Sequence, residues 1–280
     1  MPELPEVETV INDLIGTGLI GRSIVDVNIY WNRTVFPLTP TTFRQQLSGR
    51  RIESITRRAK YIVIKLDQKY WLLIHLRMTG RLYFVNNNQN HIRHEQVILS
   101  LDNSTTLRFH DTRKFGRILL TTNPESILSK LGMEPLEPLF TKESLAAVLS
   151  RSKRIIKPLL LDQTIIAGIG NIYADEALFK ARIHPCRTGA SLSKAETDRL
   201  HASIISVLKK GIRNQGTTLG SGRNNFYSVQ GQRGKNREQL QVFRRTGLPC
   251  PVCKTPICRI VVGQRSTHIC TCCQLFKPLC

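Results

Sequence analysis

Four cysteines near the C-terminus restrict the fold of this chain more than any other feature. Two residues separate Cys250 from Cys253 and Cys270 from Cys273, and sixteen residues lie between the two pairs. This spacing is typical of a zinc ribbon, in which four thiolates bind one structural Zn²⁺. A segment of about 25 residues is too small to bury a core, so we expect it to fold only with its metal. Cys272 is an adjacent alternative ligand, but the two-residue spacing favours Cys273.

The residues between the two cysteine pairs predict a β-hairpin. Ile257–Val262 and Arg265–Ile269 have strand-like sequences, and Gly263-Gln264 lies between them as the turn. Arg265 would then project from the tip of a hairpin that the metal holds rigid. A guanidinium in that position is suited to binding a phosphate. A solvent-exposed arginine without a ligand is the alternative.

The charge of the chain indicates a polyanionic partner. The 41 Lys and Arg residues outnumber the 20 Asp and Glu residues, which gives a net charge of +21. This excess favours nucleic acid as the partner. A membrane is the alternative, but we find no apolar run of about 18 or more residues. The acidic N-terminus also lacks the basic start of a secretion signal, so we expect an intracellular protein whose cysteines bind metal rather than form disulfides.

A change in hydrophobic period along the chain indicates two domains. Residues 20–120 contain eight strand-like runs, which predict a β-sandwich or barrel. These runs are Ser23–Trp31, Arg51–Thr56, Tyr61–Asp67, Tyr70–His75, Gly80–Val85, Gln96–Leu101, Thr106–His110 and Arg117–Thr121. After a proline-containing linker at Asn123–Leu139, a second domain begins, in which a Ser193…Glu196 capping box opens the last helix. Its predicted helices are Thr141–Ser150, Ile155–Asp162, Asn171–Ala181 and Ser193–Asn214.

The first residues of the chain contain a potential nucleophile. Removal of Met1 would expose the secondary amine of Pro2, next to the carboxylate of Glu3. An α-amine titrates at about pH 7.7–8, so part of it is unprotonated in the cell and can attack a sugar or carbonyl carbon. The alternative is that the acidic residues here only place negative charge in the first turn of a helix ending near Gly16, where the helix dipole favours it.

Two loops carry groups suited to binding DNA. The turn Ala167–Asn171 contains Gly168 and Gly170 just before a predicted helix, where unobstructed backbone amides can bind a phosphate. A tight turn between helices is the alternative. The loop Asp111–Gly116 contains Phe115, which can wedge between base pairs, and a core phenylalanine at the end of a loop is the alternative there.

Six sequence blocks, in the same order, resemble the formamidopyrimidine-DNA glycosylases, the bacterial 8-oxoguanine glycosylase/AP lyases. The blocks are Pro2-Glu-Leu-Pro-Glu-Val-Glu8, Arg57-Arg-Ala-Lys60-Tyr, Asp111-Thr-Arg-Lys-Phe-Gly116, Asp162-Gln, Gly168-Ile-Gly-Asn-Ile-Tyr-Ala174 and the terminal zinc ribbon. The resemblance covers essentially the whole chain. It implies an α+β fold, with an N-terminal β-sandwich flanked by helices, a helix-two-turn-helix domain ending in the zinc finger, and DNA in the cleft between them.

The resemblance also implies domain boundaries and an activity. We expect a catalytic sandwich at residues 1–122, a linker at 123–139, a helix-two-turn-helix domain with a base-capping loop at 140–239, and a zinc finger at 240–280. The capping loop corresponds to Gly220–Arg237, whose sequence departs from the commoner bacterial pattern. The expected enzyme removes 8-oxoguanine and formamidopyrimidines from duplex DNA and then cleaves the strand by β,δ-elimination. Its expected cofactor is one structural Zn²⁺.

Five residues match catalytic or supporting residues of that family. Pro2 corresponds to the nucleophile that attacks C1′ of the damaged nucleotide and forms a Schiff base. Glu3 corresponds to the general acid/base that protonates the opening sugar ring, and Glu6 to a helper in proton relay. Lys60 matches a lysine that contacts the backbone beside the lesion and assists base excision and elimination. Arg265 matches the finger arginine that holds phosphate for the δ-elimination.

Seven further residues match DNA contacts of the family. Met78, Arg113 and Phe115 correspond to the side chains that fill the space left by the everted base, with Arg113 facing the orphaned cytosine. The residues that match contacts to phosphate or backbone are His94, Lys153, Lys157 and Asn171. The expected partner is therefore damaged double-stranded DNA, bound by a monomer that works away from membranes, in the cytoplasm at the bacterial nucleoid.

Two other functions must be weighed against this one. Endonuclease VIII-type enzymes share the architecture but prefer oxidised pyrimidines, and they typically have glycine where this chain has Leu4. Leu4 and the three void-filling residues favour the purine branch. A noncatalytic zinc-ribbon DNA-binding protein is the second alternative, because every feature except Pro2, Glu3 and Lys60 would suit it.

Overall fold

The computed structural model describes residues 1–86, 89–222 and 225–276. Part of the predicted capping loop and Cys280 lie outside the described residues. The chain forms two units: unit 1 comprises Met1–Ser129 and Gly211–Arg237, and unit 2 comprises Lys130–Lys210 and Glu238–Cys280. The finer predicted division into four segments stays a prediction.

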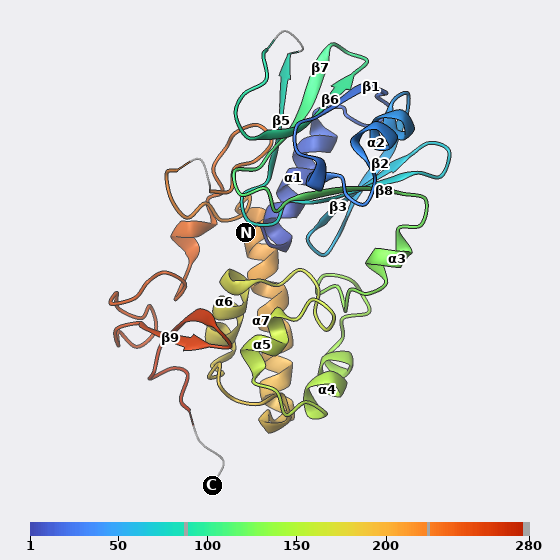
Figure 1. Ribbon diagram of the computed structural model, residues 1–280. Coiled ribbons are helices and arrows are strands. Elements are labelled where there is room, and N and C mark those ends of the chain that lie inside the picture. Colours follow the sequence, from blue (N-terminus) through green and yellow to red (C-terminus); the bar gives the residue numbers. More distant parts are fainter. Residues whose placement is uncertain (87–88, 223–224, 277–280) are drawn as a thin grey trace. The chain divides into compact units, whose positions relative to one another are not determined.

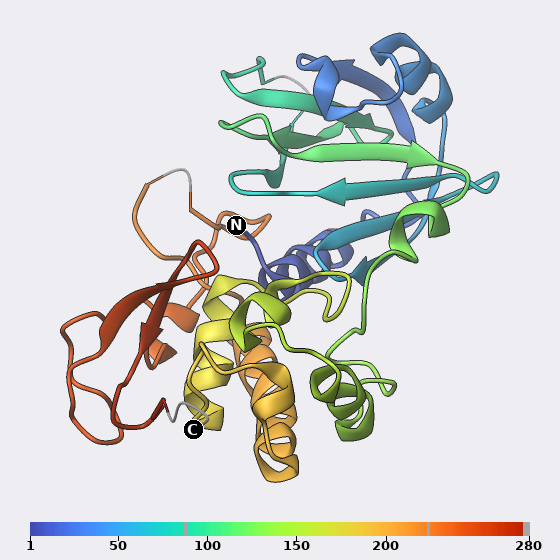
Figure 2. The ribbon, with the colours of Figure 1, turned by 60° about the horizontal axis from the view of Figure 1, so that its bottom comes forward.

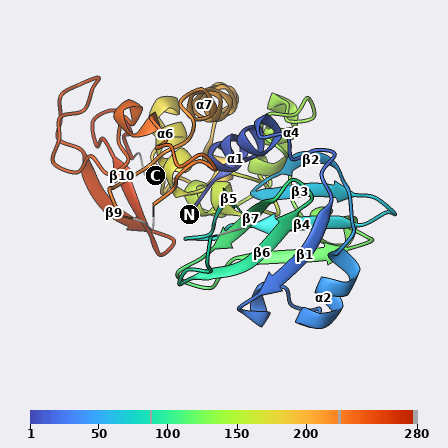
Figure 3. The same ribbon diagram turned by 90° about the horizontal axis from the view of Figure 1, so that it is seen from above.

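Unit 1 is built on two four-stranded antiparallel sheets (Figure 3). One sheet has the order β1-β6-β7-β5 and the other has the order β2-β3-β4-β8. The strands are β1 (Ile24–Ile29), β2 (Ile52–Arg58), β3 (Tyr61–Leu66), β4 (Trp71–His75), β5 (Arg81–Asn86), β6 (Glu95–Leu101), β7 (Thr105–His110) and β8 (Arg117–Thr121). Apolar residues of both sheets share one core, so the predicted sandwich is confirmed.

Two helices flank the sandwich. Helix α1 (Leu4–Gly16) buries Val7, Val10 and Leu14 in the shared core and packs against β2 and β3. Helix α2 (Pro40–Leu47) packs against β1 and was not predicted. Only two of its eight residues are buried, so its apolar period is too short to detect, although a Thr39 cap followed by proline was a usable signal.

Unit 2 is helical apart from the finger (Figure 1). Its helices are α4 (Lys142–Ser150), α5 (Ile156–Leu161), α6 (Asn171–Ala181) and most of α7 (Lys194–Arg213), close to the predicted ranges. The predicted capping box is present, because Glu196 N–H donates to Ser193 Oγ over 3.2 Å and Ser193 N–H donates to Glu196 Oε2 over 2.8 Å.

The predicted linker contains one short helix, α3 (Glu125–Leu128). Short 3-10 turns complete the chain: η1 (Asn32–Thr34), η2 (Gly189–Ser191) and η3 (Asn236–Gln239).

The finger is a two-stranded hairpin of β9 (Cys258–Val262) and β10 (Arg265–Ile269), seen in red beside yellow α6 in Figure 2. Val262 pairs with Arg265, and the two turn residues between them have φ values of 53° and 60°. Positive φ at both positions is the mark of a type I′ turn, which favours glycine. A Cβ on Gly263 would lie 2.6 Å from Pro158 Cγ, so this tip has no room for another side chain.

None of the helices within the described ranges is long and apolar enough to cross a membrane.

Candidate active site and metal centre

The start of α1 places two carboxylates beside Pro2. Glu3 is the N-cap of the helix, and its backbone N–H donates to Glu6 Oε2 over 2.9 Å as half of a capping box. Both glutamate side chains are buried, with exposed fractions of 3% and 1%. Backbone donors and the helix dipole stabilise negative charge at this end of a helix.

Glu6 also holds the segment that leads into the predicted capping loop. Its Oε1 accepts the Thr217 N–H over 2.7 Å. Gly216 precedes that contact with a φ of +78°, and a Cβ there would lie 3.0 Å from Glu6 Cγ and 2.8 Å from a ring carbon of Phe226. The carboxylate predicted to support a proton relay therefore also joins the first turn of α1 to the loop in unit 1.

Lys60 lies at the tip of the β2–β3 hairpin. Arg58 pairs with Tyr61, so Ala59 and Lys60 form the turn, and Ala59 has a φ of 54°. Lys60 is buried, with an exposed fraction of 4%. Nearby, Arg57 Nε donates to Glu8 Oε2 over 2.6 Å, which ties the end of β2 to α1. Pro2, Glu3 and Lys60 therefore belong to the same region of unit 1.

His75, in β4, is a buried neutral imidazole close to this region. Burial, followed by the charges of Arg77 and Lys60, lowers the pKa of His75 from 6.5 to about 3. Its Nδ1 accepts the Arg77 N–H over 3.0 Å, and its ring meets Tyr61 edge-on with centroids 4.7 Å apart. Burial likewise lowers the pKa of His110 to about 4.

Acid should therefore destabilise unit 1 before its carboxylates titrate. In the folded state both imidazoles stay neutral, whereas unfolded histidines gain a proton below about pH 6.5. The unfolded chain then binds more protons than the folded chain. The free energy of unfolding therefore decreases as the pH is lowered, by about 1.4 kcal/mol per pH unit for each group. His75→Asn keeps an acceptor for the Arg77 N–H and removes one of these titrations. Urea unfolding should show that the free energy of unfolding decreases less between pH 7 and pH 5 in the variant than in the wild type. An identical decrease in both would contradict the assignment of His75 as a neutral buried imidazole.

The three predicted void-filling residues are exposed. Met78 and Phe115 have exposed fractions of 42% and 48%, so neither is a core residue. Arg113 is also exposed, and its guanidinium carbon lies 4.8 Å from the centre of the Phe115 ring. Exposed apolar side chains beside a cation are suited to entering a base stack. His94, in the same unit, is partly exposed and has a φ of 76°.

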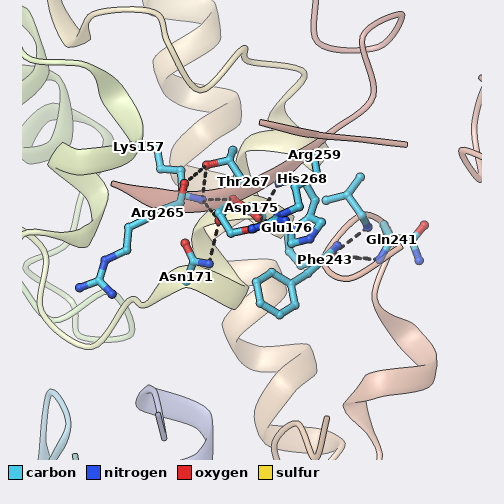
Figure 4. Close-up of polar contacts among 12 residues, drawn as sticks. Lys157, Asn171, Asp175, Glu176, Gln241, Phe243, Arg259, Arg265, Thr267 and His268 are labelled. Carbon is cyan, nitrogen blue, oxygen red and sulfur yellow. Dashed lines mark hydrogen bonds and ion pairs between the residues drawn. The ribbon is translucent and has the colours of Figure 1, made fainter. Parts of the chain in front are cut away.

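In unit 2, Lys157 does not face solvent (Figure 4). Its ammonium is fully buried and donates to Asp175 Oδ1 over 2.6 Å, to Thr267 Oγ1 over 2.7 Å and to the Ser266 carbonyl over 3.0 Å. Direct contact between this ammonium and DNA, which the family resemblance implies, does not fit the placement, because three protein acceptors surround the group. The physical role that the geometry supports is to fix β10 on α5 and α6.

Asn171 and Arg265 lie at the edge of the same network. Asn171 Nδ2 donates to the Ser266 carbonyl over 2.9 Å. Arg265 precedes that residue, is exposed, and extends away from the buried contacts in Figure 4. Lys153 is also exposed. Unit 2 therefore presents Arg265 and Lys153 to solvent, while Asn171 and Lys157 support the finger.

Only some of the backbone amides in the glycine-containing turn, which was predicted to bind a phosphate, are available for a ligand. Gly168, with a φ of +91°, donates its N–H to Gln163 Oε1 over 2.9 Å. Gln163 Nε2 in turn donates to the Ile169 carbonyl over 2.9 Å. Gln163 thus bonds both a backbone N–H and a backbone carbonyl of this turn. The Gly168 amide is already used, and the alternative interpretation, a tight turn between helices, applies to Gly168. Sequence reasoning missed this because Gln163 is five residues away and carries no motif of its own.

The four predicted metal ligands come together. The sulfur atoms of Cys250, Cys253, Cys270 and Cys273 all lie within 4.8 Å of one another, with Cys250 to Cys273 at 3.9 Å and Cys253 to Cys270 at 3.3 Å. A tetrahedral zinc with bonds of about 2.3 Å needs sulfurs about 3.8 Å apart. The Val252 N–H, 3.4 Å from the Cys250 sulfur, stabilises thiolate charge. These residues fit zinc, and among the described residues Cys272 is outside the cluster.

Removal of zinc should unfold the finger and leave unit 1 folded. The apolar cluster around the ligands is small, with Phe179, Val242 and Ile257 as its other buried members. Such a cluster cannot replace metal binding, which is worth roughly 10–16 kcal/mol in zinc-finger peptides. A strong chelator is therefore expected to weaken binding to duplex DNA while the thermal transition of unit 1 persists. Full DNA affinity in protein verified to be metal-free would contradict this.

Sequence reasoning missed three buried groups that support the finger. Asp175 Oδ2 accepts the His268 N–H over 2.9 Å and lies 3.0 Å from its Nδ1. Burial raises the pKa of the Glu176 carboxyl, and that carboxyl accepts backbone N–H groups of residues 241–243 over 2.9–3.1 Å. Two adjacent acidic residues on a helix ordinarily face solvent, so only their apolar neighbours in α6 could have signalled burial.

A proline at position 2, directly before a buried glutamate, and a four-cysteine finger in the same chain are features expected of a DNA glycosylase with lyase chemistry. Family profiles match the Formamidopyrimidine-DNA glycosylase N-terminal domain at residues 1–118, the corresponding H2TH domain at 131–222, and a zinc finger found in FPG and IleRS at 247–275. The chain belongs to the formamidopyrimidine-DNA glycosylase family. It is a DNA repair enzyme that acts on damaged DNA and carries one structural zinc ion.

Relatives of known name and structure are similar over nearly the full chain. The Formamidopyrimidine-DNA glycosylase of Protochlamydia amoebophila is 44% identical over 98% of this chain and 99% of its own. That of Herpetosiphon aurantiacus is 46% identical over 98% and 100%. A Lactococcus lactis FPG mutant bound to Fapy-dG containing DNA superposes with a TM-score of 0.91, at 33% identity over 98% of this chain and 100% of that one. The wild-type Lactococcus lactis protein with an oxidised pyrimidine in its DNA gives 0.89 at 34% identity, with the same coverage.

Proposed function

We propose that this enzyme removes oxidised purines from duplex DNA through a Schiff base on Pro2, and then cleaves the strand by β,δ-elimination. The observation that carries the proposal is the position of Pro2, directly before the buried N-cap Glu3. Once Met1 is removed, the secondary amine stands at the N-terminus of α1. An unprotonated fraction near neutral pH makes it a competent nucleophile.

The proposed chemistry balances with the residues present. The Pro2 nitrogen bonds to C1′ while the bond from C1′ to the base breaks, and the base leaves with the proton that the nitrogen loses. Glu3 protonates the ring oxygen as the sugar opens, which leaves a cationic iminium at C1′. The iminium acidifies the C2′ proton, which the Glu3 carboxylate accepts while the C3′–O bond breaks and the 3′ phosphate leaves, and a second elimination expels the 5′ phosphate. Water then releases Pro2.

The remaining residues are assigned by what each can contact. Lys60 is proposed to contact the backbone beside the lesion and assist proton transfer, and Glu6 to support the relay while it holds Thr217. Arg265, Lys153 and His94 are proposed phosphate contacts, and Asn171 is proposed to act beside the Ser266 carbonyl. We propose that Lys157 acts indirectly, through the finger, since its ammonium is buried.

Base eversion is proposed to depend on Met78, Arg113 and Phe115. An enzyme that takes a base out of the stack must replace the lost stacking, and exposed apolar side chains do this. Arg113 offers a fork of donors to the orphaned cytosine. We further propose that the protein acts as a monomer, in the bacterial cytoplasm at the nucleoid.

Oxidised pyrimidines are the second candidate substrate, because a solved relative is bound to DNA that contains one. Borohydride reduction traps the Schiff base as a covalent adduct. Duplexes with 8-oxoguanine opposite cytosine and with thymine glycol should be compared in parallel. A stronger adduct on 8-oxoguanine supports the proposal, and a stronger adduct on thymine glycol moves the protein to the pyrimidine branch. Tight binding with no adduct on either would indicate a noncatalytic DNA-binding protein.

A further inference from the structure

Asp111 is a fully buried carboxylate at the end of β7 that the proposed chemistry does not use. Its Oδ2 accepts the Gly116 N–H over 2.7 Å. Its Oδ1 accepts the Arg113 N–H over 3.2 Å and the hydroxyl of Thr79. A buried carboxylate that accepts several N–H and O–H donors is held in one orientation and orders the segments that supply them.

These donors come from the two segments that present the void-filling side chains. Thr79 directly follows Met78, and the loop from Asp111 to Gly116 contains both Arg113 and Phe115. Thr79 Oγ1 also accepts the Arg113 N–H over 3.2 Å, so the hydroxyl bridges the two segments. One carboxylate and one hydroxyl thus tie together loops that are more than thirty residues apart in the sequence.

The backbone of Asp111 reaches a third segment. Its N–H donates to the His94 carbonyl over 2.9 Å, and its carbonyl accepts Gln96 Nε2 over 2.9 Å. His94 has a positive φ, which is uncommon for residues other than glycine, and the hydrogen bond from Asp111 holds its carbonyl in place. The proposed phosphate contact at His94 is therefore held by the same residue as the two void-filling loops.

Close packing leaves these loops little freedom. A Cβ on Gly116 would lie 2.3 Å from Phe109 Cζ and 3.1 Å from Asp111 Oδ2. A Cβ on Gly80, at the end of the Met78 turn, would lie 2.4 Å from the Leu76 carbonyl oxygen. Gly116 therefore ends its loop against the core residue Phe109, and Gly80 closes the Met78 turn tightly on Leu76, so the hydrogen bonds of Asp111 join two loops whose ends are already closely packed.

We propose that Asp111 is a positioning residue for base eversion, which sets Met78, Arg113 and Phe115 in the arrangement that enters the duplex. The inference rests on the proposed function and adds a residue that acts through others. Preorganised groups avoid an ordering cost at the moment of binding, and a displacement of about 1 Å can cost roughly 100-fold in rate. The step that suffers is the extraction of a stacked, paired base.

The test compares two reactions of the full-length zinc-loaded enzyme. Excision of 8-oxoguanine opposite cytosine requires eversion of an intact base, whereas cleavage at a preformed abasic site does not. Asp111→Asn should lower single-turnover excision by about 30- to 100-fold and change abasic-site cleavage by less than about threefold. Thr79→Val should lower excision by about tenfold, and Thr79→Ser, which keeps the hydroxyl, should restore it.

Equal loss of both reactions in Asp111→Asn and Thr79→Val would overturn the proposed positioning role of Asp111, because that result indicates general damage to unit 1. Unchanged excision in both variants would overturn it as well. If Asp111→Asn fails to fold, the Thr79→Val and Thr79→Ser pair decides alone. Failure of the wild-type enzyme to excise 8-oxoguanine would instead reject the proposed function, and the two failures are thus distinguishable.

Discussion

Pro2→Ala is expected to lower borohydride trapping and strand cleavage by at least about 100-fold while duplex binding is retained. Alanine leaves a primary amine at the same place, so the loss measures what the secondary amine contributes. A proline imine is a permanent cation, whereas a primary amine gives an imine that must first gain a proton to act as an electron sink. Adduct yield on 8-oxoguanine duplexes and single-turnover cleavage rates would both report the effect.

A second proline provides the matched control. Pro5 is buried in the first turn of α1, where proline is tolerated because its missing N–H is not needed, and where alanine is also a good helix former. Pro5→Ala should therefore keep trapping within a few-fold of wild type, because it alters the helix start without touching the amine. An adduct yield in Pro2→Ala equal to that of wild type would place the nucleophile elsewhere in the chain.

Lys157→Met is expected to destabilise the finger by about 3–5 kcal/mol, because it leaves the buried Asp175 carboxylate without its ammonium partner. His268 and its backbone N–H remain as partners, yet they do not replace the lost contacts to Thr267 and Ser266. The expected result is faster release of zinc to a chromogenic chelator, with a urea transition of unit 2 at lower concentration. DNA affinity should fall as a consequence of the displaced Arg265.

Lys153 is the matched control for this prediction, since it is exposed four residues earlier. Lys153→Met should change the free energy of unfolding by less than about 0.5 kcal/mol. It should also reduce the slope of log affinity against log salt concentration by about 1, which corresponds to the loss of one phosphate contact. The double variant Lys157→Met/Asp175→Leu should recover part of the lost stability, because it removes both charges together. Zinc release at the wild-type rate in Lys157→Met would show that the buried ion pair does not hold the finger.

Local sequence patterns were sufficient to predict an element or a site wherever the residues of one short segment determine its structure. The strands of the sandwich follow from short runs rich in strand-forming residues, and the box at Ser193 and Glu196 marks the start of α7. The metal ligands follow from spacing, since two residues between cysteines bring both sulfurs to one ion. Helix α2 shows the limit, because eight residues with two buried side chains give too weak a period.

The sequence by itself determined the class of the protein, because its proposed nucleophile, its zinc ligands and its strand-rich and helix-rich regions are all properties of short segments. Only the tertiary structure decided which charged residues are exposed. Lys153 and Lys157 look alike in the sequence, yet one is exposed and the other is buried against Asp175. The roles of Asp111 and Gln163 were decided in the same way. The physical reason is that burial and hydrogen-bond partners come from residues distant along the chain, so no local pattern contains them.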